Sequence, residues 1–284
     1  MKTLLTIMVA GVAGSVPIAG AFAVAGDGIR FSPHRAVYDI TLQQSVAGSG
    51  VSELNGRMVY ELSGSACDGF SQNMRFVTRI ADEDGSTQVN DLRTSSWEAA
   101  RGKRLRFSLN QYHNDQLAEA TEGDAGRTGP DRSRVDVRLK KPTRKKVSLK
   151  PGVVFPMQHS RGLMRAAKDG KRVYSANLFD GSEKGERFYF TSAVIGNARS
   201  ETVNPVRLPD KIGASLRGRT AWPISIGYFD PDKTTADAVP SYELSFMYFD
   251  NGVSTSLMID YGDFSIRGKL AELQMLPVAE CDAP

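Results

Sequence analysis

Histidines are the first side chains to consider for chemistry, because imidazole is a common metal ligand and titrates near neutral pH. The chain has His34, His113 and His159, and none has a second His or Cys at the short spacing of a zinc site. His159 falls near the start of a predicted helix, where a lone histidine is more often a packed or capping residue than a ligand or base. The sequence therefore predicts no metal site and no cofactor.

Serine and glycine motifs give no signature of an enzyme. Gly213-Ala-Ser-Leu-Arg-Gly218 is one residue too long for the G-x-S-x-G nucleophile elbow, which also needs a strand-to-helix turn. The stretch 123–129 lacks the spacing and the following helix of a phosphate-binding loop. We expect both stretches to be loops.

Paired carboxylates are the remaining catalytic candidates. Asp260 and Asp263 are separated by Tyr-Gly, and Asp180 precedes Gly-Ser-Glu. A glycosidase needs two acids facing each other across a sugar, one with a raised pKa, whereas Asp before Gly at a strand end is usually turn chemistry. We expect no catalytic residue and no enzyme. A cell-wall hydrolase stays an alternative, which requires the acids at 260 and 263 to converge in a cleft.

The most distinctive charged feature is the segment 131–150. It has nine Lys/Arg against two Asp, a net charge of +7, and since the whole chain is +4 the remainder carries −3. Strand alternation places the charges at 134, 136 and 138 on one face, opposite Val135 and Val137, and makes 140–146 a hairpin tip. The candidate polyanion-binding residues are Arg134, Arg138, Lys140, Lys141, Arg144, Lys145 and Lys146.

Two interpretations of this basic segment stay open. Lysines at a solvated strand edge protect a sheet from edge-to-edge pairing. Alternatively, the segment attaches to a polyanion, which outside the cytoplasm means lipid phosphate, lipopolysaccharide or an acidic protein. Few aromatic residues interleave with these charges, so base stacking has no support and nucleic acid is not an expected partner.

Strand patterns dominate the elements that must position these residues. Ala36, Tyr38, Ile40 and Leu42 share one face of 35–42, and Tyr242, Leu244, Phe246 and Tyr248 share one face of 241–249. Asn251-Gly252 and Asp84-Gly85 are hairpin signals, since both residues tolerate the positive φ of a type I′ turn. Further strands are predicted over 57–63, 74–80, 87–92, 105–109, 134–139, 145–149, 172–179, 187–194, 220–229, 253–260 and 264–276. This pattern favours an antiparallel barrel, sandwich or coiled sheet.

One helix interrupts the strands. The spacing predicts it over Met157–Asp169, with Gly170 as its C-terminal cap, and it would either plug one end of a barrel or join two halves of the sheet. The stretches 115–131 and 197–211 are expected to be loops or edge excursions, because the first is rich in Gly, Asp and Glu and the second contains two prolines.

Aromatic residues gather in the C-terminal half. They are Tyr189, Trp222, Tyr228, Phe229, Tyr242, Phe246, Tyr248 and Phe249. Core packing is the default interpretation. The alternative is that they line a groove for an acyl chain in an open barrel.

The N-terminus predicts export. A short positive start, an apolar stretch over 4–16 and A-x-A sites ending at Ala23 and Ala25 form a secretory signal peptide over 1–25, with either cleavage point open. The rival interpretation, an uncleaved anchor, is weakened by Gly11, Gly14 and Pro17 in a barely sufficient apolar run. The remaining 26–284 is expected to be one domain, free in the periplasm, without a lipid anchor because no Cys lies near the cleavage region.

The two cysteines are Cys67 and Cys281. An oxidising compartment and an even count favour a disulfide between them, and two free thiols are the alternative. Neither lies in a C-x-x-C motif or beside a His, so a catalytic thiol is not expected.

Several stretches resemble the alphaproteobacterial cell-envelope integrity protein EipB family. They are His34-Arg-Ala-Val-Tyr-Asp-Ile, Tyr60-Glu-Leu-Ser-Gly-Ser-Ala-Cys67-Asp-Gly, Phe155-Pro-Met-Gln-His159 and Phe179-Asp-Gly-Ser-Glu-Lys-Gly, with Ile195-Gly196 following. The resemblance implies a periplasmic, spiralling antiparallel sheet that forms a broad open barrel, with Cys67 and Cys281 at the family's disulfide positions. It also implies a role in envelope integrity and stress resistance, and a link to a periplasmic tetratricopeptide-repeat protein.

Three functions follow from these observations. The first is a non-enzymatic, monomeric envelope factor that binds a partner protein, which predicts a filled barrel interior. The second is a lipid or lipoprotein carrier, which predicts an apolar interior groove with a mouth. The third is the cell-wall hydrolase described above.

Overall fold

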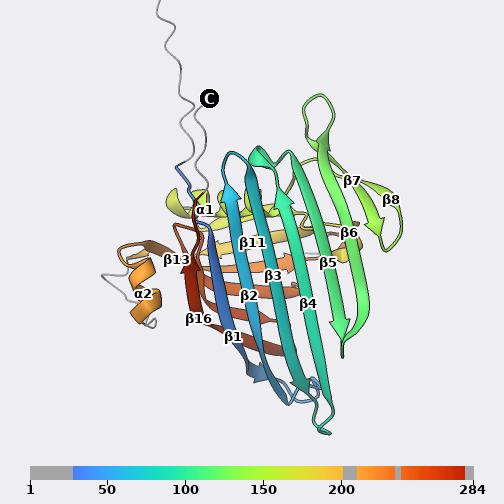
Figure 1. Ribbon diagram of the computed structural model, residues 1–284, viewed down its shortest axis with the longest axis vertical. Coiled ribbons are helices and arrows are strands. Elements are labelled where there is room, and N and C mark those ends of the chain that lie inside the picture. Colours follow the sequence, from blue (N-terminus) through green and yellow to red (C-terminus); the bar gives the residue numbers. More distant parts are fainter. Residues whose placement is uncertain (1–27, 201–209, 234–237, 279–284) are drawn as a thin grey trace, which may run out of the picture.

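The computed structural model describes residues 28–200, 210–233 and 238–278. In this part of the chain the strands form one sheet that curls into a nearly closed barrel (Figure 1). The strands are β1 His34–Ser45, β2 Glu53–Ser65, β3 Gly69–Ala81, β4 Thr87–Glu98, β5 Arg104–His113, β6 Gln116–Thr128, β7 Arg134–Lys141, β8 Lys145–Leu149, β9 Val153–Val154, β10 Val173–Leu178, β11 Tyr189–Ile195, β12 Arg199–Ser200, β13 Thr220–Phe229, β14 Tyr242–Phe249, β15 Ser254–Asp260 and β16 Phe264–Met275. The helices are α1 Pro156–Lys168 and α2 Asp210–Leu216, with short 3-10 turns η1 Ala100–Gly102, η2 Glu183–Gly185 and η3 Pro231–Lys233.

The sheet winds continuously from one edge to the other. Its order is β8-β7-β6-β5-β4-β3-β2-β1-β16-β15-β14-β13-β11-β10-β9, with β12 paired to β13. The pairs are antiparallel except β9 with β10, which is parallel. The first and last strands are neighbours, since His34 lies opposite Met275. The predicted mainly β, spiralling antiparallel barrel is confirmed.

Alternation along the strands builds the interior. On β1, Ala36, Tyr38 and Ile40 are buried while Asp39 and Thr41 are exposed, as their spacing predicts. Each buried large apolar side chain contributes about 1.5–3 kcal/mol relative to an exposed one.

The two predicted hairpins form, but the predicted type I′ turn is wrong. Only the glycines take positive φ, 82° at Gly85 and 89° at Gly252, and the residues before them do not. The Gly252 N–H donates to the Phe249 carbonyl at 2.9 Å, and the Phe249 N–H donates to the Val253 carbonyl at 2.9 Å. This is a three-residue loop in which one left-handed glycine follows a type I turn, so the twist of the strands needs no second left-handed residue.

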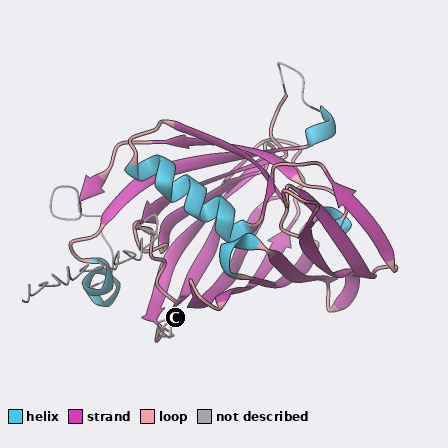
Figure 2. Cartoon of the chain, turned by 90° about the horizontal axis from the view of Figure 1, so that it is seen from above, coloured by secondary structure: helices cyan, strands magenta, loops and turns pink. Residues whose placement is uncertain are grey.

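Helix α1 lies across one end of the barrel (Figure 2), the first of its two predicted roles. Its buried face includes Met157, Leu163 and Met164, which belong to a core cluster with the barrel wall. Gly170, at φ 72°, ends the helix as predicted. The Gly170 N–H donates a hydrogen bond to the Ala167 carbonyl at 3.2 Å, and the Lys171 N–H donates one to the Ala166 carbonyl at 2.9 Å.

The predicted loop over 115–131 is instead mostly the strand β6, Gln116–Thr128. Thr121 and Ala125 are buried on its inner face. Between them, a Cβ on Gly123 would come within 2.8 Å of the Phe107 ring. The small residues that suggest a loop therefore lie on the inner face of β6, where they leave room for the Phe107 ring.

The second correction concerns Gly213–Gly218, which was expected to be a loop but begins inside α2, Asp210–Leu216. This helix lies on the outside of the barrel in Figure 1. Ile212 and Leu216 are buried there in a cluster with Ala221 and Phe249. Of the other predicted loop, 197–211, the part 201–209 lies outside the described residues, as do the predicted signal peptide and Cys281.

Candidate functional site

The barrel encloses an interior cavity of about 590 Å³. Its wall is mainly apolar and aromatic, and includes Met58, Met74 and Phe76 from β2 and β3, and Ile226, Leu244, Phe246, Leu257 and Ile259 from β13 to β15. Pro156, His159 and Leu163 close the end beneath α1. The size lies within the range of pockets that hold small molecules, which are mostly apolar with a few polar groups.

The far end of the cavity opens near the β15–β16 turn. Tyr261 in that turn lines the cavity and is 39% exposed. Phe264, next to it, lies opposite Ser45 at the end of β1 that is remote from His34. An adjoining cleft of about 620 Å³ shares Leu92 and Ser182 with the cavity. The interior is therefore connected to the surface away from the helix.

The aromatic residues singled out from the sequence divide between the cavity and the core. Tyr189, Tyr228, Tyr242, Phe246 and Tyr248 line the cavity. Trp222 and Phe249 are buried in core clusters, and Phe229 packs against Phe190 with ring centroids 6.1 Å apart. Core packing is confirmed for the buried members, of which Tyr228 and Tyr248 also line the cavity. That the cavity holds an acyl chain stays a prediction.

Three of these aromatics form what we call the tyrosine cluster, Tyr189, Tyr228 and Tyr242. The Tyr228 and Tyr242 rings stack at 4.3 Å between centroids, because the two residues face each other across β13 and β14. Tyr189 meets both rings edge-on, at 5.8 and 6.0 Å. Burial raises the pKa of each phenol, so all three are neutral donors at physiological pH.

The segment Asp180–Gly185, here called the mouth segment, carries the only carboxylate among the described residues that line the cavity, Asp180. Burial raises the pKa of Asp180, against the hydrogen bonds that its Oδ1 accepts from the Ser182 N–H at 2.9 Å and hydroxyl at 2.6 Å. Glu183, further along, accepts a hydrogen bond of 2.5 Å from the Tyr189 hydroxyl.

The backbone of the mouth segment is strained. Glu183 and Lys184 have φ of 50° and 57°, which costs of order 1–3 kcal/mol for each non-glycine residue. The neighbouring glycines let the segment pack closely against β5 and β7. A Cβ on Gly181 would lie 2.3 Å from the Phe107 ring, and a Cβ on Gly185 would lie 2.6 Å from the Leu139 side chain. The Phe179-Asp-Gly-Ser-Glu-Lys-Gly stretch is thus the part of the chain that shapes the cavity mouth.

The two buried histidines belong to the cavity wall and are neutral. His159 Nε2 lies 2.9 Å from the Thr191 hydroxyl, which itself donates to the Ala176 carbonyl at 3.0 Å. Because that hydroxyl has one proton, His159 must donate from Nε2. Burial lowers the pKa of His159 to about 4, and it also lowers that of His34, whose Nδ1 lies 2.8 Å from the Ser32 carbonyl. His159 therefore packs and donates, as the sequence analysis favours.

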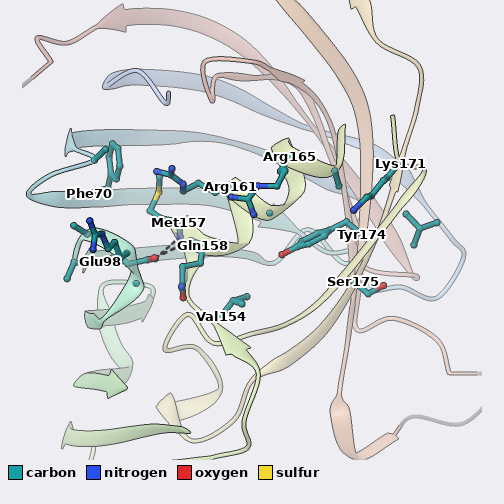
Figure 3. A pocket seen from close by; sticks show the side chains of 18 residues that line it. Phe70, Glu98, Val154, Met157, Gln158, Arg161, Arg165, Lys171, Tyr174 and Ser175 are labelled. Carbon is teal, nitrogen blue, oxygen red and sulfur yellow. Dashed lines mark hydrogen bonds between the residues drawn. The ribbon is translucent and has the colours of Figure 1, made fainter. Parts of the chain in front are cut away.

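A second hollow, the basic groove, of about 810 Å³, lies beside α1 on the surface (Figure 3). Its cationic lining is Arg101, Arg161, Arg165 and Lys171, and β10 contributes Val173, Tyr174 and Ser175. Val173 is 56% exposed. No sequence pattern indicated this groove, because its charges come from three separate segments.

Glu98 lies at the inner end of the basic groove and was missed by sequence reasoning. Its carboxylate accepts hydrogen bonds from the Met157 N–H at 2.7 Å and the Gln158 N–H at 3.1 Å, the dashed contacts in Figure 3. Burial raises its pKa to about 7, against these bonds and the charges of Arg127 and Arg161. A strand-ending Trp-Glu pair gives no signal in sequence that it will meet a helix 59 residues further on.

The remaining predicted site residues do not converge. Asp260 and Asp263 are exposed on a turn, where Asp260 accepts a hydrogen bond of 2.8 Å from the Gly262 N–H. They share no cleft, so the condition for the hydrolase alternative is not met. His113 is exposed and pairs with Gln111 at 3.0 Å. No cluster of metal-ligating side chains occurs among the described residues.

The basic segment forms β7, β8 and their hairpin tip at an edge of the sheet, as predicted. Lys140 and Lys141 lie 3.0 and 3.8 Å from Glu122, and Lys145 lies 2.6 Å from Glu186. In the described part of the chain, the candidates Arg134, Arg138, Arg144 and Lys146 make no ion pair within 4.0 Å.

Cys67 is exposed in the turn between β2 and β3. The described end of β16 approaches this turn, since Met275 lies opposite His34 and His34 lies opposite Leu62. The disulfide stays a prediction because Cys281 lies outside the described residues.

Within those residues, no helix is both long and apolar enough to cross a membrane.

The chain is similar in sequence and in structure to known proteins. The sequence pattern of the EipB-like family matches residues 25–277. The chain is 37% identical over 268 residues to the cell envelope integrity protein EipB of Brucella abortus (strain 2308), covering 94% of this chain and 90% of the relative. A crystal structure of a beta-barrel-like protein of a domain of unknown function from Brucella abortus matches with a TM-score of 0.78 at 36% identity, covering 88% of this chain and 100% of that one. This chain therefore belongs to the EipB-like family, as the motifs quoted from its sequence predict.

Proposed function

We propose that this protein supports the integrity of the bacterial cell envelope as a monomeric, non-enzymatic binding protein of the periplasm. Its interior cavity receives an extended apolar group, such as the acyl chain of an envelope lipid or lipoprotein. The observation that carries this proposal is the cavity of about 590 Å³, lined mainly by apolar and aromatic side chains and open at the end away from α1. The name of the Brucella relative, a cell envelope integrity protein, supports the envelope role.

The hollow interior favours a carrier over a pure scaffold. A protein that only presents its outer surface to a partner has no need of a cavity, and the scaffold hypothesis predicts a filled barrel. Leaving apolar surface in contact with water costs about 25 cal/mol per Å². A bound chain removes that cost for residues such as Leu244, Phe246 and Ile259. The enzyme hypotheses gain no support, because the acids and histidines of the described part of the chain do not form a catalytic set.

The test is binding of an uncharged fluorescent probe with an acyl chain to the mature chain, with one variant that fills the cavity. Leu244 lines the cavity, so Leu244→Trp places a large ring where the chain would lie. Met258→Trp is the matched control, because Met258 is 38% exposed on the outer side of neighbouring β15. We expect binding by the wild type and by the control, and at least about tenfold weaker binding by Leu244→Trp, a loss of about 1.4 kcal/mol. Equal binding by all three proteins would place the ligand outside the cavity and contradict the proposal.

A second function, binding of a partner protein, is favoured by the basic groove. Arg101, Arg161, Arg165 and Lys171 surround it, and the outer edge of β10 pairs with β9 only at Asn177 and Leu178. An extended acidic segment fits such a site by charge and by strand addition. The tetratricopeptide-repeat protein implied by the family resemblance is the candidate partner.

Periplasmic cross-linking from residue 173 tests this second function, in the wild type and in the Lys171→Glu variant. We expect the cross-link to the partner to be lost when the charge at 171 is reversed. An unchanged cross-link contradicts the proposed binding site.

A further inference from the structure

The cavity wall contains a half-buried carboxylate without a counter-charge. Asp180 lines the cavity, and among the described lining residues there is no Lys or Arg. The two lining histidines are neutral, as described above. Oδ1 of Asp180 accepts hydrogen bonds from the N–H and hydroxyl of Ser182, and Oδ2 has no hydrogen-bond partner in the described part of the chain. A carboxylate that is partly removed from water and has no cation beside it in the cavity wall is costly, so its surroundings point to a positively charged ligand group.

The tyrosine cluster stands beside this carboxylate. Asp180 lines the cavity together with Tyr189, Tyr228 and Tyr242. Burial raises the pKa of all three phenols, and the charge of Asp180 raises it further. Of the other ionised groups that act on Tyr189, Glu183 is acidic, and Asp230 is paired with Arg187. Aromatic faces attract ammonium groups through the ring quadrupole, and the attraction is strongest where water is excluded.

Tyr261 extends the aromatic surface toward the solvent. Its ring lies 6.3 Å from that of Tyr242 and is stacked on Phe264 at 4.9 Å. Apolar side chains of the cavity, among them Leu244 and Ile259, continue inward from this point. One end of the cavity thus combines a carboxylate with aromatic faces, while the remainder suits a hydrocarbon chain.

We propose that Asp180 and the tyrosine cluster bind the substituted ammonium group of an amphiphile whose hydrocarbon chain occupies the interior cavity. The inference rests on the proposed function, because it names the head group of the ligand for the same cavity. The carboxylate supplies the charge, the tyrosine rings supply cation–π contacts, and the mouth segment holds the carboxylate in position. Amphiphiles with an anionic head group are disfavoured by the same negative field.

Three single-chain amphiphiles with twelve-carbon chains, counting the carboxylate carbon of one of them, test this by calorimetric titration of the mature protein below their micelle concentrations. They are dodecyltrimethylammonium, dodecanoate and dodecyl maltoside. We expect the ammonium compound to bind at least about tenfold more tightly than dodecanoate, the size of a partly desolvated charge and cation–π contribution. Asp180→Asn should remove most of this preference and leave the affinity for the maltoside unchanged.

Asp169→Asn is the matched control, because it removes the same charge from an exposed position at the end of α1, away from the cavity mouth. It should keep the preference for the ammonium compound. Equal affinities for the three amphiphiles, or a preference that Asp180→Asn does not change, would overturn the head-group site while leaving the cavity proposal intact. Absence of binding by every amphiphile would overturn both.

Discussion

The carboxylate of Glu98, at the end of β4, accepts backbone hydrogen bonds from Met157 and Gln158 in the first turn of α1. Phe155, at the N-cap position, offers no polar side chain to these N–H groups. The barrel wall therefore supplies the cap that the helix sequence lacks. Gln158 completes the junction: its Oε1 accepts from the Phe155 N–H at 3.2 Å and from Arg127 at 2.8 Å.

This junction predicts a pH dependence of stability. Burial raises the pKa of Glu98 to about 7 in the folded protein from 4.5. Between these values the folded state binds more protons than the unfolded state, so the contribution of Glu98 to the free energy of unfolding falls as pH rises from about 4.5 to about 7. The total change is roughly 3 kcal/mol.

Urea unfolding of the wild type and Glu98→Gln at pH 5, 6, 7 and 8 isolates this contribution, because other groups titrate equally in both proteins. The free energy of unfolding of the wild type minus that of the variant should fall as pH rises, and it should level off above pH 7. A difference that stays constant over this range shows that Glu98 is ionised throughout.

The pairing of His159 with Thr191 predicts a structural cost. Thr191→Val leaves the buried Nε2–H of His159 without an acceptor, which should lower the free energy of unfolding by about 1–3 kcal/mol. Ser192→Ala is the control, since its hydroxyl pairs at 3.2 Å with Ser175 on an exposed face. Denaturant unfolding measures both. A Thr191→Val effect no larger than that of the control contradicts the assigned hydrogen bond.

The predicted disulfide has a thermodynamic signature. Closing so long a loop stabilises a protein by roughly 5 kcal/mol in the loop-entropy account. Cys67→Ser, Cys281→Ser and the double variant should therefore lose the same amount of stability, and a reductant should lower the melting temperature of the wild type only. Thiol labelling of unfolded exported protein checks the bond directly. Two reactive thiols in the oxidised wild type would refute it.

The basic edge strand predicts an effect on binding without an effect on stability. Arg138 lies directly opposite Lys146 on β8 and Asp124 on β6, so a like-charge pair and an opposite-charge pair offset each other. Arg138→Gln should therefore change stability by less than about 0.5 kcal/mol while weakening sedimentation with anionic lipid vesicles at low salt. Lys140→Gln, whose lysine is already paired with Glu122, is the control. Equal vesicle binding by both variants and the wild type supports edge protection alone.

Much of the fold follows from local sequence patterns. The alternation in β1 and β14, the glycine hairpins and the cap of α1 at Gly170 are each determined by residues a few positions apart. The error at β6 has a different origin, because Gly123 is selected by Phe107 on the neighbouring strand and local composition does not reveal that partner. The same holds for α2, which is short and depends on packing of Ile212 and Leu216 against the outer wall.

The candidate site was only partly predictable. The aromatic residues that line the cavity were visible as a cluster in sequence, and Asp180 stood out as one of the paired acids. Its position beside three tyrosines depends on the register of β13 and β14 and on the path of the mouth segment. The basic groove combines residues from η1, α1 and β10, so only the closed barrel brings its charges together.

The most direct measurement of the central claim is native mass spectrometry of the mature protein released from the periplasm without detergent. We expect a complex heavier than the polypeptide by the mass of an acyl-chain amphiphile, present in the wild type and in Met258→Trp and lost in Leu244→Trp. A wild type that leaves the periplasm free of any such ligand, and that takes up none when lipid is added, would contradict the claim that the interior cavity is a binding site.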